Sequence, residues 1–268
     1  MKKKMIFAVA AVLISGVTMG QELLTSKKGV PILPGAGDYA IGVDATPFLD
    51  YSGNLFNGNL GNTSPGFSYS PDRPFSIYGK RFIDANSAYR ATFRLGVGNN
   101  SISNNVADVT DTTGEKFVED KTTNSGFNVT LGLGKEWRRG KGRLQGVYGG
   151  EALVNLNSSK FKNEYGNSLQ DIDDSTLTRT LEVKNGFGFG ITVRAFVGVE
   201  YFIAPKMSIG AEYGYALGFN TRGYGETTTE ALEPTGTTST TVDTGTKATG
   251  FGLDTDASGF NIKFNFHF

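Results

Sequence analysis

The strongest constraint on the fold is a strict alternation of apolar and polar residues over the last ten residues, 259–268. Phe260, Ile262, Phe264, Phe266 and Phe268 occupy every second position, and Asn, Lys, Asn and His fill the gaps. Successive side chains of a β-strand point to opposite faces, so one face of this segment is apolar and the other polar. Such a strand is an aggregation hazard in water. The pattern favours a strand whose apolar face meets lipid and whose edges are paired in a closed barrel.

Seven earlier segments show the same period of two, so the sequence predicts an all-β fold with about eight strands. Apolar side chains alternate in them with Gly, Thr, Asn and charged residues. Eight is the smallest common strand number of bacterial membrane barrels, so we predict an eight-stranded antiparallel up-and-down transmembrane β-barrel. The seven segments are residues 39–46, 75–83, 89–98, 127–137, 144–154, 189–201 and 207–219.

The connections between these segments alternate between short and long. Tight turns are predicted at residues 84–87, 139–142 and 204–206. Long polar loops are predicted at residues 52–74, 99–124, 157–186 and 220–256. This alternation is typical of outer-membrane barrels, which have short periplasmic turns and long extracellular loops, and it places both termini in the periplasm. The Thr-rich stretch 227–249 is predicted to be a mobile loop.

The first residues form a targeting segment. Lys2, Lys3 and Lys4 precede an apolar run, and the small residues Thr18 and Gly20 precede Gln21. This is the pattern of a secretory signal peptide over residues 1–20. Residues 21–37 are predicted to be an irregular periplasmic leader, which either tucks into the barrel mouth or stays flexible. Residues 38–268 form the predicted barrel domain.

Composition narrows the function classes. After residue 20 no apolar run is long enough for a membrane helix. Without residues 1–20 the chain holds 23 basic and 26 acidic residues, a mild balance that argues against nucleic-acid binding. The chain has no Cys, which excludes disulfides and a lipid-modified Cys.

Alternation alone does not say which face points outward. The face of Gly, Ala, Ser, Thr and charges suits the narrow lumen of a small barrel, and the Leu, Val, Ile, Phe and Tyr face suits lipid. Aromatic residues near the strand ends match the girdles of membrane barrels. The facing of the strand at 75–83 stays open, because either choice turns one of Lys80 and Arg81 outward, and a β-bulge is suspected there.

Three stretches resemble the OmpA/OmpX-type small outer-membrane barrels, in the form common in Bacteroidota-like bacteria. They are residues 198–206, residues 210–213 and residues 261–268, and the resemblance covers residues 38–268. It implies that the barrel-assembly machinery recognises the last strand through Asn261, Phe264, Phe266 and Phe268. Lys263 stands where the family signal often has Gly. The resemblance implies an architecture and no activity.

The predicted lumen face carries charges of both signs. Inside so small a barrel they should pair, which predicts a salt-bridge network filling the lumen. The alternative is a narrow ion path in which these charges set selectivity. The nine predicted lumen charges are Arg90, Arg94, Glu136, Arg138, Glu151, Arg194, Glu200, Glu212 and Lys263.

No catalytic, cofactor or metal site is predicted. His267 is the only His, and it is predicted to be an ordinary polar-face residue at the periplasmic rim. With one His and no Cys a transition-metal site is nearly excluded. Residues 254–259 begin like a calcium loop, but the position of its bidentate Glu is Asn265, inside a strand. The Gly-x-Gly pairs lie within strands rather than before a helix, so they are not nucleotide-binding turns.

The sequence therefore predicts a non-enzymatic outer-membrane barrel with a structural or surface-interaction role. Its expected partners are outer-membrane lipid, the assembly machinery and an extracellular ligand at the loops, with no nucleic acid and no cofactor. Two alternatives stay open. One is a narrow channel for ions or small solutes, and the other is an outer-membrane enzyme or ligand-binding adhesin with its site in the loops.

Overall fold

The structure is a computed structural model that describes residues 24–45, 77–140, 142–174, 176–255 and 261–268. The predicted signal peptide (1–20), the loop at 52–74 and most of the calcium-like motif (254–259) lie outside the described residues.

The described chain is built almost entirely from antiparallel β-strands. Its single described α-helix, α3 (Leu169–Ile172), is capped by Ser168. None of the helical structure described is long and apolar enough to cross a membrane. The strands are β1 (Tyr39–Asp44), β2 (Ile77–Asp84), β3 (Ser87–Ala107), β4 (Phe117–Arg139), β5 (Leu144–Glu164), β6 (Thr178–Lys184), β7 (Gly188–Ala204), β8 (Met207–Arg222), β9 (Gly225–Glu233), β10 (Gly236–Thr244), β11 (Ala248–Thr255) and β12 (Asn261–His267).

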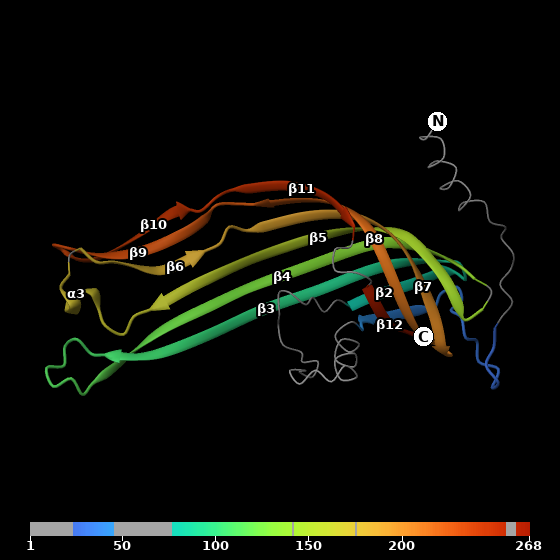
Figure 1. Cartoon of the computed structure of the whole chain (residues 1–268), viewed down its shortest axis with the longest axis horizontal. Helices are drawn as coiled ribbons and strands as arrows, with labels where there is room; N and C mark the ends of the chain where they lie inside the picture. The colour runs from blue at the N-terminus through green and yellow to red at the C-terminus, as the bar shows by residue number, and fades with distance from the viewer. Residues whose placement is uncertain (1–23, 46–76, 141, 175, 256–260) are drawn as a thin grey trace.

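The strand pairings close into a ring. Neighbours along the chain pair from β1 to β5, then β5 pairs β7, β7 pairs β8, and β8 pairs β12. The ring closes where β12 pairs β1, with Ile41 opposite Phe266. β12 thus lies between β1 and β8, as expected for the last strand of the predicted up-and-down barrel. Figure 1 shows this ring at one end of an elongated molecule.

The other four strands continue strands of the ring. β6 and β7 lie end to end beside β5, and β9 continues β8 beside β6. β10, β11 and β12 likewise follow one line along β9 and β8. Thr244 pairs with Gly225, and Ala248 then pairs with Arg222, so the register shifts by one residue across that gap. The twelve described strands therefore follow eight lines, and the part beyond the ring is here called the extension (Figure 1).

The prediction of long loops at 99–124, 157–186 and 220–256 is wrong for most of their length. β3, β4 and β5 run on into the extension, and most of the stretch 227–249, which was predicted to be mobile, forms the hairpin of β9 and β10. Thr has a high β-propensity, and hydroxyl pairs join the strands: Thr227 and Thr244 at 2.6 Å, Thr228 and Thr241 at 2.8 Å. These strands are polar on both faces, so they lack the alternation that identifies a strand.

The outward faces of the ring and of β11, which pairs with β8, carry a band of exposed, large apolar side chains, here called the apolar belt. Leu133, at its middle, is 73% exposed. Aromatic rings lie at both ends of the band. At the end of the ring where the chain makes its tight turns, Tyr39 stacks on Phe268 and Trp137 stacks on Tyr148. The belt includes Ile41, Tyr89, Phe93, Leu95, Val97, Phe127, Leu131, Leu133, Trp137, Leu144, Ile191, Val193, Val197, Val199, Tyr201, Tyr213, Tyr215, Leu217, Phe219, Phe251, Leu253, Phe266 and Phe268.

The structure settles the facing of the strand predicted at 75–83. Lys80 is buried within the ring, whereas Arg81 is outward and lies over the Tyr39 ring. A register shift does occur in this strand, but between Phe82 and Asp84, beyond both basic residues. Arg81 is therefore an outward charge at the edge of the belt rather than the product of a bulge.

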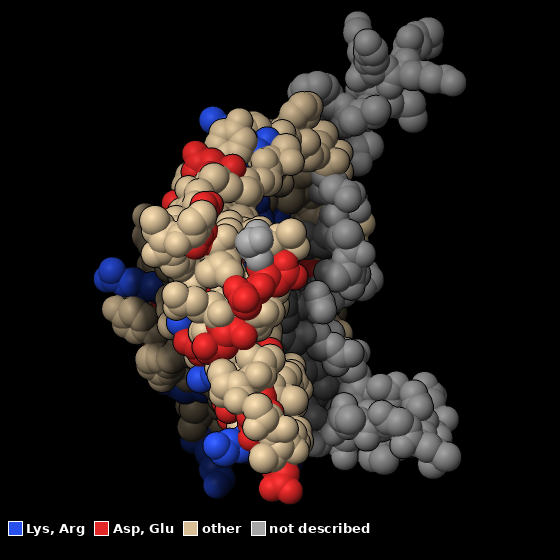
Figure 2. Space-filling model, turned by 90° about the vertical axis from the view of Figure 1, so that its left-hand side faces the viewer, with Lys and Arg blue, Asp and Glu red and all other residues tan. Residues whose placement is uncertain are grey.

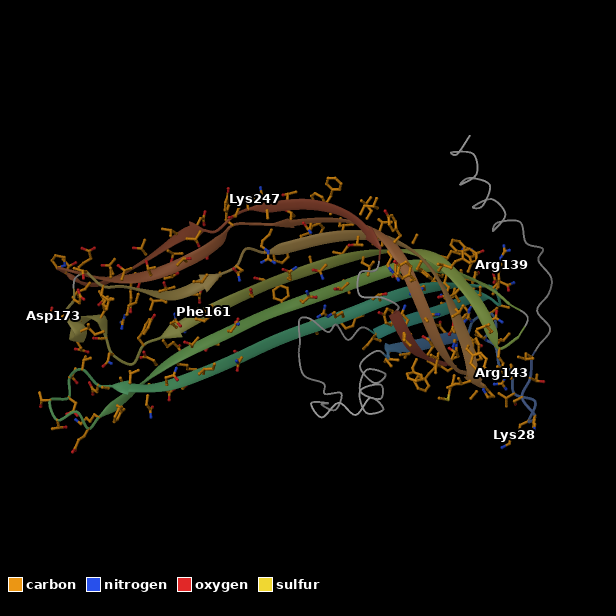
Figure 3. The ribbon with its side chains drawn as sticks, in the orientation of Figure 1. Lys28, Arg139, Arg143, Phe161, Asp173 and Lys247 are labelled. Carbon is orange, nitrogen blue, oxygen red and sulfur yellow. The ribbon has the colours of Figure 1, made fainter. Side chains whose placement is uncertain are left out.

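The two ends of the molecule differ in construction. Figure 3 places Arg139 and Arg143 at the end with the tight turns and Asp173 at the far end of the extension. The beginning of β1 and the end of β12 meet at the tight-turn end, where Tyr39 N donates to Phe268 O at 2.8 Å. Figure 2 views the extension end and shows both acidic and basic side chains on its surface.

Candidate functional site

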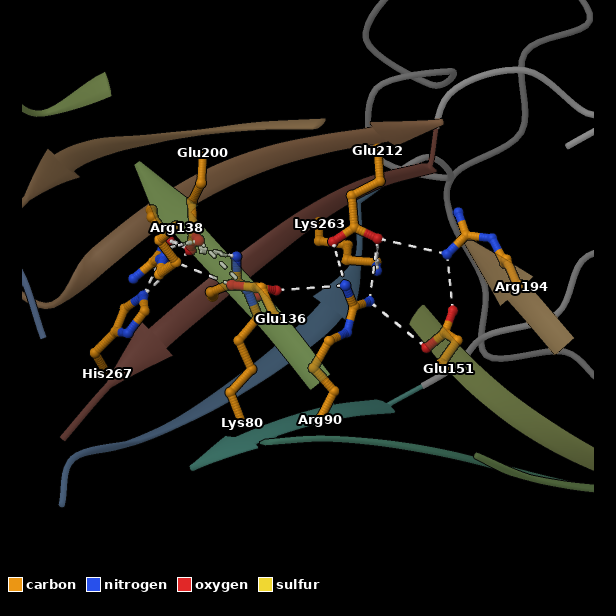
Figure 4. Close-up of polar contacts among 12 residues, drawn as sticks. Lys80, Arg90, Glu136, Arg138, Glu151, Arg194, Glu200, Glu212, Lys263 and His267 are labelled. Atoms are coloured by element: carbon orange, nitrogen blue, oxygen red, sulfur yellow. Dashed lines mark hydrogen bonds and ion pairs between the residues drawn. The ribbon is translucent and has the colours of Figure 1, made fainter. Parts of the chain in front are cut away.

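The interior of the ring holds a cluster of charged side chains, each less than one-tenth exposed. Strand alternation places them there, because every charged residue of the set lies on the face opposite the apolar belt. Each is held by a strand that is hydrogen-bonded on both edges, which fixes its position. The set comprises Lys80, Arg90, Glu136, Arg138, Glu151, Arg194, Glu200, Glu212 and Lys263 (Figure 4).

The half of the network nearer the tight turns is centred on two carboxylates. Lys80 Nζ lies 2.9 Å from Glu136 and 3.3 Å from Glu200. Arg138 pairs with Glu200 through its terminal nitrogen, and its Nε lies 3.5 Å from Glu136. The two cations and two carboxylates form a closed set of alternating charges, the arrangement that buried ions require.

The half of the network nearer the extension is centred on Glu212. Arg90 donates to both of its oxygens, at 3.0 and 3.1 Å, and Lys263 Nζ lies 2.7 Å away. Arg194 pairs with Glu151 at 2.7 Å and approaches Glu212 at 3.8 Å. Arg90 also lies 3.3 Å from Glu136, so it connects the two halves.

Aromatic rings fill the space between these charges. Arg90 lies over the Phe196 ring at 4.0 Å and Lys263 over the Tyr78 ring at 3.9 Å. The Arg138 guanidinium lies between Phe82 and Phe202, at 5.1 and 5.3 Å from the ring centres. The quadrupole of a ring face attracts a cation, so these contacts add to the ion pairs. The sequence did not predict aromatic residues on this face.

His267 belongs to the network, which corrects its assignment as an ordinary residue of the polar rim. Its side chain is buried between the rings of Phe82 and Phe202. Its Nε2 lies 3.1 Å from Ser208 Oγ and 3.4 Å from Glu200 Oε1. Within the described residues its Nδ1 has no hydrogen-bond partner.

Ser208, His267 and Glu200 do not form the relay of a serine hydrolase. In that relay the imidazole accepts the serine proton on one nitrogen while the acid orients the other nitrogen. Here the Ser208 hydroxyl donates to Glu200 instead, and His267 Nε2 faces both residues. Ser208 is also completely buried. The cluster holds charge and hydrogen bonds in place, with Asn265 donating to Glu200 at 2.9 Å.

The structure brings together eight of the nine predicted lumen charges. Arg94 is the exception. It is half-buried on the extension side of the network and has no ion pair within the described residues. The prediction missed Lys80, His267, Ser208 and Asn265. The parity of 77–82 would have identified Lys80 only with a reason to prefer it over Arg81. His267 and Asn265 share the parity of Lys263 and could have been found by it.

A cavity of about 360 Å³ lies next to His267 at the tight-turn end, between the ring and the segment at 24–38. Leu24, Ile32 and Leu33 line it, with Lys206 and His267. Gly37 N donates to Phe82 O at 3.0 Å and Phe82 N to Asp38 O at 2.8 Å, so this segment is fixed to the mouth of the ring. This matches the tucked arrangement rather than the flexible one.

The remaining predicted residues lie in β12. Phe266 and Phe268 are outward, and Phe264 is half-buried on the same face, opposite Ile209. Their role in assembly, together with Asn261, stays a prediction. Among the residues that the structure describes, no cluster of three or more His, Cys, Asp or Glu side chains could hold a metal ion.

No protein-family model matches this chain, and no curated protein matches it. Among solved structures the chain is similar to a major outer membrane protein from Thermus thermophilus, with 15% sequence identity and a TM-score of 0.30. The match covers 87% of this chain and 100% of that chain. A similarity of this degree does not assign the chain to a family.

Proposed function

We propose that this protein is an integral outer-membrane β-barrel of eight strands, non-enzymatic, with a closed charged lumen and a rigid extension displayed outside the cell. The observation that carries the proposal is the apolar belt around a ring of strands with a charged interior. A soluble barrel has the opposite polarity, apolar within and polar without. Exposed Leu, Val and Phe side chains in a band require an apolar surrounding.

The height of the belt matches one bilayer. On β4 it runs from Phe127 to Trp137, eleven residues of which every second one is outward. These outward residues are apolar except Lys135, whose Nζ lies 5.3 Å from the centre of the Trp137 ring at the end of the band. At about 3.3 Å per residue this is about 33 Å along the strand. A tilt of about 40° reduces this to about 25 Å across the membrane, the height of the apolar band of known membrane barrels. Where β1, β2 and β12 complete the ring, the strand edges are paired, as a lipid environment requires.

The asymmetry of the ends supports the orientation. Membrane barrels place tight turns in the periplasm and longer structure outside the cell. On that basis the tight turns, the mouth segment 24–38 and both termini are periplasmic, and the extension is extracellular. The partners we propose are outer-membrane lipid at the belt and the barrel-assembly machinery at Asn261, Phe264, Phe266 and Phe268. An extracellular ligand would meet the extension.

Single-cysteine labelling tests this proposal, because the chain has no Cys of its own. Leu133→Cys lies in the middle of the belt, and Thr238→Cys lies exposed on β10. In intact cells a membrane-impermeant maleimide should label Thr238→Cys and leave Leu133→Cys unreacted. Both should react after denaturation. Equal labelling of the two variants in intact cells would refute the membrane assignment.

A narrow channel is the second candidate, favoured by the sharing of partners within the network. Glu136 contacts Lys80, Arg90 and Arg138, so these cations can exchange acceptors without losing all of their pairing. Such exchange would open a path between the side chains. Planar-bilayer recordings test this candidate. Discrete openings that change in Glu136→Gln would support a channel, and a silent bilayer would support the closed lumen.

A further inference from the structure

Two neighbouring strand lines of the wall are interrupted at the same level. β6 ends at Lys184 and β7 begins at Gly188, while β8 ends at Arg222 and β9 begins at Gly225. Gly223 N donates to Phe187 O at 3.1 Å, so the two interruptions lie side by side. Across the first interruption β5 changes partner, from Gly188 opposite Asn157 to Lys184 opposite Lys160. Together they form a kink in the wall where the ring meets the extension.

Glycines make this kink possible. A Cβ at Gly186 would come within 1.8 Å of Gly223 O, and a Cβ at Gly225 within 2.4 Å of Lys184 O. Any side chain at these positions would force the backbones apart. The close approach is therefore built into the sequence.

A shallow cavity of about 360 Å³ lies at this kink. We call it the kink cavity. Its lining includes Ser159, Lys160, Lys184, Phe187, Tyr224 and Glu226.

The kink cavity lies at the upper boundary of the apolar belt. The Phe187 ring contacts the ring of Phe127, the uppermost belt residue of β4, at 6.5 Å between centres. Towards the extension the outward residues become polar, as in the change from Leu156 to Ser158 along β5. A boundary of this kind coincides with the headgroups of the surrounding lipid.

Two lysines converge on the kink cavity. Lys160 and Lys184 are opposite each other in register, an unfavourable arrangement for like charges unless an anion lies between them. Glu182 partly meets this need, at 3.3 Å from Lys160 and 3.2 Å from Lys184. Lys184 also pairs with Glu226 at 3.1 Å, and that hydrogen bond is the main reason why the pKa of Lys184 is raised. Both lysines are about half-exposed, so these ion pairs are weak and can exchange for a stronger anion.

The rim supplies the other contacts that a headgroup needs. Tyr224 is 60% exposed and Phe187 is 53% exposed, so both present apolar surface beside the lysines. Asn185 donates to Ser159 Oγ at 2.7 Å, which places an amide and a hydroxyl in the lining. The cavity therefore combines cations, hydrogen-bonding groups and aromatic surface at the level of the membrane interface.

We propose that the kink cavity binds the phosphate of an anionic lipid of the surrounding leaflet, with Lys160 and Lys184 pairing to the phosphate and Tyr224 and Phe187 contacting the adjoining part of the lipid. The inference rests on the membrane assignment made above. Basic clusters at the interface recognise phosphorylated headgroups through these contacts. Glu182 and Glu226 already pair with these lysines and oppose the bound phosphate, so their charges limit the affinity.

Native mass spectrometry of the full chain, purified in a neutral detergent and titrated with single lipids, tests the proposal. The probes are phosphatidic acid, which bears a phosphate monoester, phosphatidylcholine, which has no net charge, and inorganic phosphate. The protein should retain phosphatidic acid in preference to phosphatidylcholine. Lys160→Gln with Lys184→Gln should weaken that binding about tenfold, and Glu226→Gln should strengthen it.

Lys162→Gln is the matched control. Lys162 lies two residues further along β5 on the same face, is similarly exposed, and pairs with Glu164 rather than lining the cavity. It should change phosphatidic acid binding less than twofold. An equal effect of Lys162→Gln, or equal retention of the two lipids, would overturn the proposal. Competition by millimolar inorganic phosphate would assign the site to free phosphate and would overturn its assignment to a lipid.

Failure of this inference is separable from failure of the membrane assignment. The Leu133→Cys variant, purified in the same way and reconstituted into vesicles, is checked in parallel for protection of its cysteine. Protection without lipid preference rejects the kink cavity alone. Loss of protection rejects the membrane assignment, and the inference with it.

Discussion

The ring and the extension use the same ion-pair chemistry in opposite environments. In the ring Glu151 and Arg194 lie 2.7 Å apart with side chains 5% and 8% exposed. In the extension Lys162 and Glu164 lie 2.6 Å apart with side chains 45% and 48% exposed. The distances barely differ, so distance does not distinguish the two pairs. Burial does, because a buried charge that loses its partner cannot turn to water.

The networks also differ in connectivity. Glu200 contacts Lys80, Arg138, Ser208, Asn265 and His267. Glu182, in the extension, contacts Lys160 and Lys184, both half-exposed. Removal of one ring carboxylate therefore strands several buried groups at once, whereas removal of Glu182 leaves two solvated lysines. The ring is a part whose charges depend on each other, and the extension is a part that tolerates change.

The largest expected effect is that of Glu200→Gln. It should lower the free energy of unfolding by about 3–5 kcal/mol, because the buried charges of Lys80 and Arg138 are then left with the single carboxylate of Glu136, which they share with Arg90. Glu182→Gln should cost about 0–1 kcal/mol. Urea unfolding from lipid vesicles measures both, with the fluorescence of Trp137, the single Trp of the chain, as the signal. Equal losses in the two variants would remove the distinction between the ring and the extension.

Double-mutant cycles on the two pairs of equal length give the next largest difference. Glu151→Gln with Arg194→Gln should show a coupling energy of about 2–3 kcal/mol. Lys162→Gln with Glu164→Gln should show about 0.2–1 kcal/mol. At 1 M salt the second coupling should fall towards zero and the first should persist, because screening acts mainly on exposed charges. A salt-sensitive coupling at Glu151 and Arg194 would mean that water reaches the interior.

The sequence predicted the ring better than the extension, for a physical reason. A strand with an apolar outward face and a polar interior face alternates, so residues 89–97 or 127–137 are recognisable from the pattern alone. Strands of the extension have polar residues on both faces, as in 236–244, and no alternation remains to be detected. Their pairing depends on register with distant strands, which a local pattern does not contain.

The same reasoning explains the candidate site. Parity along each strand identified Arg90, Glu136 and Glu212 as interior residues. It could not choose between Lys80 and Arg81, whose positions are equivalent until the pairing with β1 and β3 is known. Phe196 and Phe202 share the interior parity, but the expectation of a small-residue lumen hid them. These rings contact the cations of neighbouring strands, and a contact between strands cannot be read from the pattern of one strand.

Aromatic contacts should repeat the contrast on a smaller scale. Phe196→Leu removes the ring next to Arg90 and Arg194, at 4.0 and 5.4 Å, and should cost about 2 kcal/mol because these cations are desolvated. In the extension Arg179 lies 4.4 Å from the Tyr165 ring. Tyr165→Leu should cost about 0.5–1 kcal/mol more than Tyr165→Phe, which removes only the hydroxyl that donates to Thr180 O. Urea unfolding again measures each variant. A Phe196→Leu cost below that of the Tyr165 comparison would show that the interior rings only fill space.

The smallest expected effect is confined to the tip between β3 and β4. The Asp111 carboxylate accepts from the backbone N–H of Lys116 at 2.8 Å, and from Thr113 and Glu115. These bonds, that of Lys116 first, lower its pKa from 3.8 to about 2. The folded tip favours the ionised form, so this stabilisation is complete above pH 3.8 and is lost as the pH falls towards 2.

The amide resonance of Lys116 should therefore shift with a midpoint near pH 2 in an NMR titration. The transition should disappear in Asp111→Asn and stay unchanged in Asp243→Asn, another exposed acid of the extension. Resonances of ring strands such as β4 near Gly134 should not follow this titration, because the carboxylate is exposed and its hydrogen bonds end at the tip. If they did follow it, a local event in the extension would be transmitted to the ring. The independence of the two regions would then be disproved.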